Sequence, residues 1–544
     1  MSRAPAAGPG RTALFPRWVL MLSAAIALST VIPHLHQAAT PPPDMVFTGF
    51  VEAIDDHDLY ATWVEQMGRG RLLVADYQTA EEAPPFLPSP PWLMMGLIAR
   101  VLPLPTPVSY HAVRLLWGFG YLLILWLLVR EFIAQPLARA FAFVAAALGS
   151  GFGVVVDAVN VLAGRPVLLS ADLMPELWSF HSLFAPHFIL ATALIALLAL
   201  IALRAYRRPA RSLSVAAFAT MALLALTHPY DVGFLVPLLA GHFVYCRIAR
   251  PDGWRGATVN LWALAGIAPP AAFLWWQMRT NPIVAAWGEQ NVLRSPPPLA
   301  YLLGFGAVLA LAGWGRIVLG RLRRETAGDW LILFWPLVTA IAVYSYPVLP
   351  FERRCVEGVH LPLALLAGIA LGHGIVPALR RRLAGWSARG VAALVMGLLL
   401  AAILPTNIKL VADGAMTREA LVPRGWVEGF AWVADNTPED ARLFTSHRTG
   451  LFLARYALRH VHHGHWNVTV DVERKRAMAD RFFAPDTPDA ERLAILRAAG
   501  CGWVAADAHQ AAAIAGTEGL ELAHDAGDLV ILRFPEDPPP PPLE

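Results

Sequence analysis

Long apolar runs dominate this chain and determine the solvent in which it must fold. They are about 17–25 residues long, which is the length needed to cross a bilayer core of roughly 30 Å. Charged residues make up only 15% of the 544 positions, and the mean hydropathy is +0.50. These values lie outside the range of soluble globular domains. We therefore expect an α-helical polytopic membrane protein with about 11 transmembrane helices. They are predicted at 16–36, 110–129, 139–157, 188–203, 213–227, 232–246, 258–276, 299–315, 330–348, 360–376 and 391–411.

Positive charge indicates which way these helices run. The segment "PPFLPSPPWLMMGLIARVLPLP" (84–105) has a short apolar core between prolines, and it fits either a span or a helix in the membrane interface. If it lies in the interface, every basic cluster falls on the side of the N-terminus, as the positive-inside rule requires. We therefore expect the first long loop (37–109) and everything after residue 411 to be extracytoplasmic. The clusters are Arg130 and Arg139; Arg204, Arg207, Arg208 and Arg211; Arg247, Arg250 and Arg255; Arg316, Arg321, Arg323 and Arg324; and Arg380, Arg381, Arg382 and Arg389.

The chain changes character after residue 411. The segment from Gly425 to Asn436 has amphipathic helical spacing and ends before a proline, whereas "RLFTS", "GCGWVAAD" and "DLVILRF" are typical of short strands. We predict a transmembrane domain over residues 1–411 and an extracytoplasmic α/β domain over 412–535. The proline-rich end, 536–544, is predicted to be a disordered tail.

Composition narrows the classes of partner and location. The net charge is only +3, and the 43 basic residues are spread along the chain, so we expect no nucleic-acid partner. The three cysteines, Cys246, Cys355 and Cys501, form neither a CxxC pair nor an even-numbered disulfide set. The composition, rich in Ala, Arg and Pro, is typical of a bacterial protein. We therefore expect it in the bacterial inner membrane.

Acidic residues are concentrated directly after the first apolar run, in "DDHD" (55–58). On a helix, Asp56, Tyr60, Trp63 and Met67 share one face, which suits a carboxylate that faces a pocket at the membrane interface. The alternative is that these acids are solvated residues at a helix start. There the helix dipole and the free N–H groups favour carboxylates without any further function.

Several motifs, taken in order, resemble the GT-C superfamily of polyprenyl-phosphate-sugar-dependent glycosyltransferases, in a bacterial branch related to protein O-mannosyltransferases and the aminoarabinose transferase. In "DHDLY" (56–60), His57 stands where the family pattern D-E-x-x-Y has Glu, which leaves open which nearby Asp is the functional acid. The resemblance implies a GT-C-like fold and the inverting transfer of a hexose or pentose. The donor would be a polyprenyl-phosphate sugar in the membrane lipid, and the acceptor an extracytoplasmic glycan, lipid or protein. The other motifs are "GLIARVLPLPTPVSYHAVRLLWG" (96–118), "MPELWSFHSLFAPH" (174–187), "HPYD" (228–231), "FERRCVEGVHLP" (351–362) and "GHW" (464–466).

The chemistry that the resemblance implies assigns roles to these residues. An acceptor hydroxyl loses a proton as it attacks the anomeric carbon, and we predict Asp56 as the base, with Asp55 and Asp58 as alternatives. The departing lipid phosphate needs positively charged donors, and Arg353 and Arg354 are predicted to supply them. The alternative for these arginines is interfacial anchoring or pairing with the two glutamates of their own motif. The predicted substrate-binding residues are His57, Tyr60, Glu176, His181, His228, Asp231, His465 and Trp466.

Cofactors and two other classes of function stay open at this point. The histidines of "RHVHHGHW" (459–466) lack a nearby carboxylate or cysteine that would complete a metal-ligand set, so no metal site is assigned there. The acids at 55–58 are an alternative site for Mg or Mn, because oligosaccharyltransferase members of the superfamily use a divalent cation. The alternatives to an enzyme are a membrane transporter or lipid flippase, for which no inverted repeat is visible, and a non-catalytic cell-envelope assembly protein.

Overall fold

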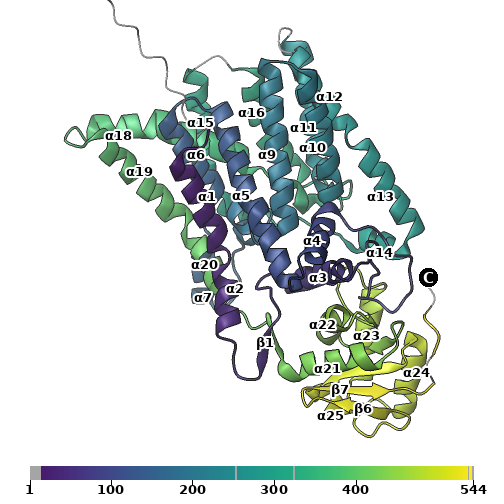
Figure 1. Cartoon of the computed structure of the whole chain (residues 1–544). Helices are drawn as coiled ribbons and strands as arrows, with labels where there is room; N and C mark the ends of the chain where they lie inside the picture. Colours follow the sequence, from purple (N-terminus) through teal and green to yellow (C-terminus); the bar gives the residue numbers. More distant parts are fainter. Residues whose placement is uncertain (1–13, 251–253, 323–324, 537, 542–544) are drawn as a thin grey trace, which may run out of the picture.

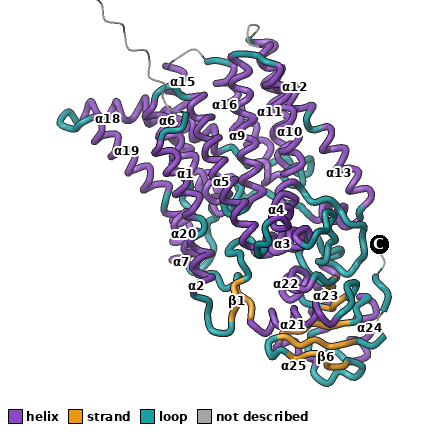
Figure 2. Tube along the Cα trace, viewed as in Figure 1, coloured by secondary structure: helices purple, strands orange, loops and turns teal. Residues whose placement is uncertain are grey.

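The apolar runs fold into a bundle of long helices, and the C-terminal part of the chain forms a small α/β domain at one end of that bundle (Figure 1). The computed structural model describes residues 14–250, 254–322, 325–536 and 538–541. Two of the predicted basic positions, Arg323 and Arg324, lie outside the described residues, as does part of the predicted tail. Figure 2 shows that the strands gather in the C-terminal domain, apart from the short strand β1 in the first loop.

Each of the eleven predicted runs contains a helix, since a backbone in hydrocarbon must satisfy its hydrogen bonds within the segment. The run at 330–348 is helical only as far as Ala342, and the run at 139–157 is interrupted at 149–152. By length and composition, seven helices of the described chain can cross a membrane, or up to nine if each of two bent pairs counts as one span. The two remaining runs are the shorter apolar helices α10 and α16. The predicted positions are thus confirmed as helices, while the total of eleven spans stays a prediction. The bundle comprises α1 (Arg17–Ser29), α2 (Ile32–Ala39), α5 (Thr106–Phe132), α6 (Pro136–Leu148), α7 (Gly153–Ala163), α9 (Pro186–Arg207), α10 (Arg211–Thr227), α11 (Val232–Ala249), α12 (Trp254–Ala265), α13 (Ala268–Thr280), α15 (Pro298–Leu322), α16 (Ala327–Ala342), α17 (His360–Ile369), η4 (Ala370–Ile375), α18 (Val376–Arg382), α19 (Ala388–Ile403) and α20 (Pro405–Met416).

Two short helices of the first loop, α3 (Ile54–Gly68) and α4 (Pro90–Val101), lie between the bundle and the C-terminal domain (Figure 1). With 12 residues, α4 is too short to cross a bilayer core, in keeping with the interfacial helix expected in this segment. The two helices pack closely because Gly96 leaves room for Met67. A Cβ atom at position 96 would lie only 2.3 Å from the Cβ of Met67.

Three further short helices and two single turns join the spans at the same end. They are η1 (Ala171–Leu173), α8 (Ser179–Ser182), η2 (Pro229–Asp231), α14 (Pro282–Gln290) and η3 (Glu352–Val356). Of these, η1 packs against α15 and α7, and η2 and η3 pack against each other. Two of them meet the first loop, α8 through His181 and Glu52 and α14 through Trp287 and Trp63.

The C-terminal domain contains a five-stranded sheet in the order β4-β3-β5-β7-β6. The β3 strand pairs in parallel with β4 and β5, while β7 pairs antiparallel with β5 and β6. The predicted amphipathic helix and the three predicted strands are confirmed. The elements are β3 (Arg442–Phe444), β4 (His460–Val461), β5 (Trp503–Asp507), β6 (Glu521–Asp525) and β7 (Leu529–Arg533), with α21 (Arg424–Asn436), α22 (His447–Ala457), α23 (Val472–Phe482), α24 (Asp489–Ala499) and α25 (Ala508–Ile514).

The first loop and the C-terminal domain share one hydrophobic core. Phe50 and Trp63 of the loop belong to the same buried cluster as Phe430 and Phe452 of the C-terminal domain. In addition, β1 (Met45–Phe47) pairs antiparallel with β2 (Leu421–Pro423), at the entry to that domain. Because burying large aromatic side chains is strongly favourable, this shared core fixes α3 against the C-terminal domain, although the two are hundreds of residues apart in the chain.

Candidate active site

Helix α3 carries the acidic stretch, and its three aspartates turn to three different partners. Asp55 and Asp56 occupy the first turn, where the helix dipole favours negative charge. Within the described structure no side chain caps this helix start, so the carboxylates are free to reach across to the C-terminal domain. Oδ2 of Asp55 accepts a bond from Nε2 of His447 (3.0 Å), whereas Asp58 is fully buried and pairs with Arg455 of α22. Asp56 pairs with His465.

The Asp56–His465 pair has a defined hydrogen-bond direction. The backbone N–H of Asn467 donates to Nδ1 of His465 (3.2 Å), which makes Nδ1 an acceptor and assigns the ring proton to Nε2. Nε2 then donates to Oδ1 of Asp56 at 2.9 Å. Burial alone would raise the pKa of Asp56, but the hydrogen bond from His465 and the nearby charge of Arg354 outweigh it and lower the pKa to about 2. Asp56 is therefore an oriented carboxylate that stays ionised at physiological pH.

Asp56 lies in the wall of a cavity of about 800 Å³ that is mostly apolar. The polar part of the wall comes from segments at the end of the bundle and from the C-terminal domain: Asp56 and Tyr60 of α3, His228 just before η2, Arg354 of η3 and Trp466 after β4. The apolar part comes from α4, α10 and α13. It includes Trp92, Ala222, Leu226, Pro269, Pro270, Phe273 and Leu274. Polar groups of one face and apolar side chains of several helices thus surround a single space.

Arg354 reaches this cavity while it is held from behind by a buried carboxylate. Oε1 of Glu176 accepts from Nη1 of Arg354 at 3.0 Å and lies 3.1 Å from Nη2 of Arg353. Glu176 is fully buried, and although burial raises the pKa of its carboxyl group, the two arginines lower it below its usual value. Arg354 also packs over the ring of Phe188, with its guanidinium carbon 4.8 Å from the ring centre. One carboxylate therefore orients both arginines.

The alternative considered from the sequence was that Arg353 and Arg354 pair with Glu352 and Glu357 of their own motif. The described residues do not show this pairing. Glu352 accepts backbone N–H bonds from Ser295 and Tyr346, and Glu357 lies against His228. The partner of Arg353 and Arg354 is instead Glu176, which lies 177 and 178 positions before them in the chain. Arg353, unlike Arg354, is absent from the described lining of the cavity.

Three predicted substrate-binding residues lie behind the described cavity wall. Glu176 is buried beneath the arginines and does not line the described cavity. This position favours a role in orienting the arginines rather than in binding a sugar. His57 is buried against Phe50, and burial lowers its pKa to about 4. Burial also opposes the charged form of His181, yet its bond to Glu52 raises the pKa above the usual value. Glu52 itself lines a second, smaller cavity of about 380 Å³ at the start of α3.

The predicted residues that meet at the large cavity are therefore Asp56, Tyr60, Arg354, His228 and Trp466, with His465 behind Asp56. Asp231 lies next to His228, with its Oδ2 atom 3.1 Å from Nδ1 of that histidine. Two tryptophans that contribute to the wall, Trp92 and Trp287, were not predicted. Their spacing gave no signal, because they come from helices whose apolar patterns are also typical of lipid-facing helices.

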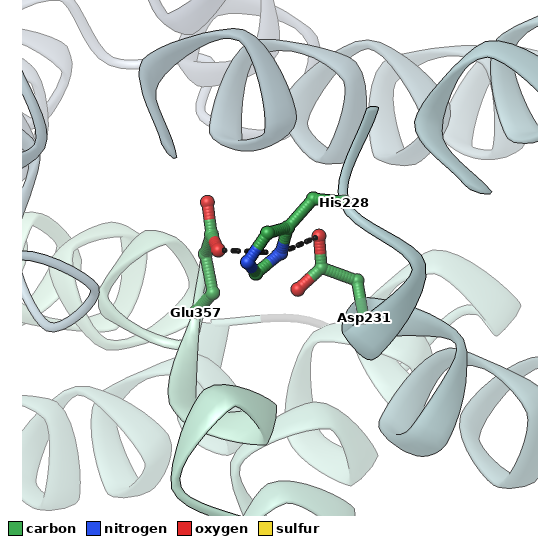
Figure 3. Close-up of side chains that lie close together, drawn as sticks. All are labelled: His228, Asp231 and Glu357. Carbon is green, nitrogen blue, oxygen red and sulfur yellow. Dashed lines mark ion pairs between the residues drawn. The ribbon is translucent and has the colours of Figure 1, made fainter. Parts of the chain in front are cut away.

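The acids at 55–58 do not fit a shared cation site. A divalent cation needs several ligand atoms within a few ångströms of one another, whereas Asp55, Asp56 and Asp58 point to different partners. Among the described residues, the group that converges is His228, Asp231 and Glu357, whose ligand atoms all lie within 4.8 Å of one another (Figure 3). Glu357 was considered from sequence only as a partner for the arginines. A buried group compatible with a divalent cation is thus present, at a different place from the predicted one.

Solved structures with a similar fold are known. The apo oligosaccharyltransferase of Archaeoglobus fulgidus gives a TM-score of 0.55 at 15% identity, over 90% of this chain and 69% of that chain. ArnT from Cupriavidus metallidurans, bound to undecaprenyl phosphate, gives 0.54 at 16% identity, over 95% and 97% of the two chains. The arabinofuranosyltransferase AftD from Mycobacteria gives 0.54 at 16% identity, over 96% of this chain and 42% of that chain. No family model and no curated protein matches the sequence. The protein has the GT-C fold that these glycosyltransferases share, as the sequence motifs predicted.

Proposed function

We propose that this protein is an inverting glycosyltransferase that moves a sugar from a polyprenyl-phosphate donor to an acceptor outside the cytoplasm of a bacterium. The observation that carries the proposal is the ionised carboxylate of Asp56 in the wall of an apolar cavity that also contains Arg354. The fold supports the class of reaction. One structural neighbour, ArnT, is bound to undecaprenyl phosphate, and another, AglB, to an inhibitory peptide and a dolichol-phosphate.

The cavity matches the two-part chemistry of such a donor. Its apolar side, formed by α10 and α13, suits the hydrocarbon chain of the lipid, because apolar surface buried there stays out of contact with water. Arg354 suits the phosphate, because a guanidinium offers two parallel N–H donors to phosphate oxygens. The indole rings of Trp92 and Trp466 and the phenol ring of Tyr60 offer flat faces on which a sugar ring can pack.

The proposed transfer is a single displacement. The acceptor oxygen forms a bond to the anomeric carbon from the face opposite the phosphate, while the bond from that carbon to the phosphate oxygen breaks. The hydroxyl proton passes to Asp56, and the bonding electron pair leaves with the lipid phosphate, whose negative charge Arg354 stabilises. Because a carboxylate with a pKa of about 2 is a weak base, proton transfer has to follow carbon–oxygen bond formation, when the hydroxyl has become strongly acidic.

His465 and Glu176 have positioning roles in this proposal. His465 donates to one oxygen of Asp56 and so orients the carboxylate. Glu176 orients Arg354 from the side away from the cavity. No step is assigned to a metal at Asp55, Asp56 and Asp58, since these carboxylates diverge.

The proposal is tested by replacing Asp56 and, as a matched control, Asp55. Both are in the first turn of α3 and both pair with a histidine, but within the described structure only Asp56 of the two lines the large cavity. Wild-type, Asp56→Asn and Asp55→Asn chains are purified with their native lipids, and the bound lipids are identified by mass spectrometry. We expect Asp56→Asn to retain a polyprenyl-phosphate sugar that the other two proteins consume. The same lipids in all three proteins at equal folded yield would contradict the role of Asp56.

A further inference from the structure

A buried group of one imidazole and two carboxylates lies beside the cavity, outside the residues that the proposed transfer uses. His228 directly precedes η2 and Asp231 ends it, between α10 and α11, and Glu357 follows η3. Nδ1 of His228 is 3.1 Å from Oδ2 of Asp231 and 3.1 Å from Oε2 of Glu357 (Figure 3). Asp231 and Glu357 are fully buried and His228 is nearly so.

Protein hydrogen bonds leave this group unsatisfied. Nδ1 of His228, both oxygens of Asp231 and Oε2 of Glu357 are buried and have no hydrogen-bond partner among the described residues. One Nδ1–H group cannot serve two carboxylates in good geometry. The nearby arginines are already engaged by Glu176. Oδ2 of Asp231 and Oε2 of Glu357 therefore lie near the same ring nitrogen, and neither oxygen has a hydrogen-bond donor among the described residues.

We propose that His228, Asp231 and Glu357 bind a divalent cation through Nδ1 and one oxygen of each carboxylate. Ligands at the usual metal–ligand distances of about 2.0–2.2 Å in a tetrahedral site are about 3.4 Å apart. The two 3.1 Å separations of His228 approach that spacing. A cation accepts lone pairs from all three atoms at once, which is what the unpartnered atoms require.

The donor set selects the class of ion. One imidazole nitrogen with two carboxylate oxygens suits Zn²⁺ or Mn²⁺, whereas Mg²⁺ and Ca²⁺ prefer oxygen ligands throughout. The outer contacts fit this assignment: Oγ1 of Thr192 donates to Oε1 of Glu357 at 3.0 Å, which leaves Oε2 for the ion. His228 also lines the large cavity, so the ion has a path to the site. This site connects η2, the segment after η3 and α9, and it does not depend on the transfer reaction.

The test measures metal rather than activity. The full-length chain is purified in detergent, stripped with a chelator, and titrated separately with Zn²⁺ and Mn²⁺, with bound metal measured by elemental mass spectrometry. We expect one tight ion per chain in the wild type. Asp231→Asn and Glu357→Gln should bind it at least about tenfold more weakly. Glu131→Gln, which removes a carboxylate that pairs with Arg204 and Arg207 at the far end of α5, should bind as the wild type does.

Two results of the metal titration would overturn the proposal. One is a folded wild-type chain that binds neither ion, in which case the three residues share protons instead. The other is equal metal content in wild type, Asp231→Asn and Glu357→Gln, which means an adventitious ion elsewhere. If the variants do not fold, X-ray absorption of the zinc-loaded wild type identifies the ligand atoms of the ion. Nitrogen and oxygen scattering with a histidine signature supports the site, and sulfur scattering, as from Cys355, contradicts it.

Discussion

Replacing Arg354 by methionine should weaken the binding of a polyprenyl phosphate, and replacing its neighbour Arg353 should not. The two arginines are adjacent in η3 and bond the same carboxylate, that of Glu176. They differ in one respect that matters: in the described structure Arg354 lines the large cavity and Arg353 does not. Methionine keeps an unbranched apolar stem of similar length, so the substitution removes the charge and the N–H donors while conserving most of the packing.

The expected magnitude follows from the contact that is lost. A hydrogen bond to a charged group contributes about 1.5–3 kcal/mol, and each 1.4 kcal/mol changes a dissociation constant about tenfold. Arg354→Met should therefore raise the Kd for undecaprenyl phosphate by about ten- to 150-fold. The loss is expected near the upper end, because the guanidinium acts in an apolar cavity where water screens charge weakly.

Native mass spectrometry of the full-length chain in detergent measures both variants against the same ligand. Undecaprenyl phosphate is titrated first and undecaprenol, which lacks the phosphate, second. Arg354→Met should bind the two lipids with similar Kd values, whereas Arg353→Met should retain the wild-type preference for the phosphate. Equal losses in the two variants would mean that Glu176 and its arginines form a structural unit only. An unchanged Kd in folded Arg354→Met would refute the phosphate role.

Three further results are expected. Since the pKa of Asp56 is about 2, transfer should show no acid limb from this group between about pH 5 and 8. In His465→Ala, loss of the hydrogen bond lets burial raise that pKa, so the rate of donor consumption should fall on the acid side; identical pH profiles would contradict the pairing. Burial raises the pKa of Asp76 to about 7, so its ionised form destabilises the folded state increasingly as the pH rises from about 4 to 7. Asp76→Asn should therefore stabilise the protein by at most about 4 kcal/mol at pH 8 and about 2 kcal/mol at pH 5. A gain in thermal unfolding temperature that does not change with pH would argue against this. Arg455→Met strands the buried Asp58 and should cost about 3–5 kcal/mol, most of which Asp58→Asn in the same chain should restore. Equal melting temperatures for the single and double variants would show that the pair contributes little.

Local sequence patterns were sufficient to predict most of the helices and several of the strands. Runs of apolar residues become helices in a membrane whatever their neighbours are, because no other conformation satisfies the backbone there. The strand-like runs after residue 411 likewise form strands β3, β5 and β7. The face shared by Asp56, Tyr60 and Trp63 was also predictable, since helical spacing alone puts these residues side by side, and all three line the cavity.

Partners far apart in the sequence could not be predicted in this way. Asp55, Asp56 and Asp58 are equivalent as a sequence pattern, and only their contacts with residues 392 to 409 positions away distinguish them. Glu176 had no signal as the partner of the arginines, since the described chain between them includes the nine α-helices from α8 to α16. Glu357 joined His228 and Asp231 only when two loops met.

The sequence by itself determined the solvent, the helices and the side chains available at one end of the bundle, since these depend on hydropathy and on periodicities of a few residues. The tertiary structure alone decided which carboxylate faces the cavity, which arginine reaches it and which three residues converge. The physical reason is that a charge in an apolar surrounding must find a partner within a few ångströms, and the folded chain brings those partners from segments that no local pattern connects.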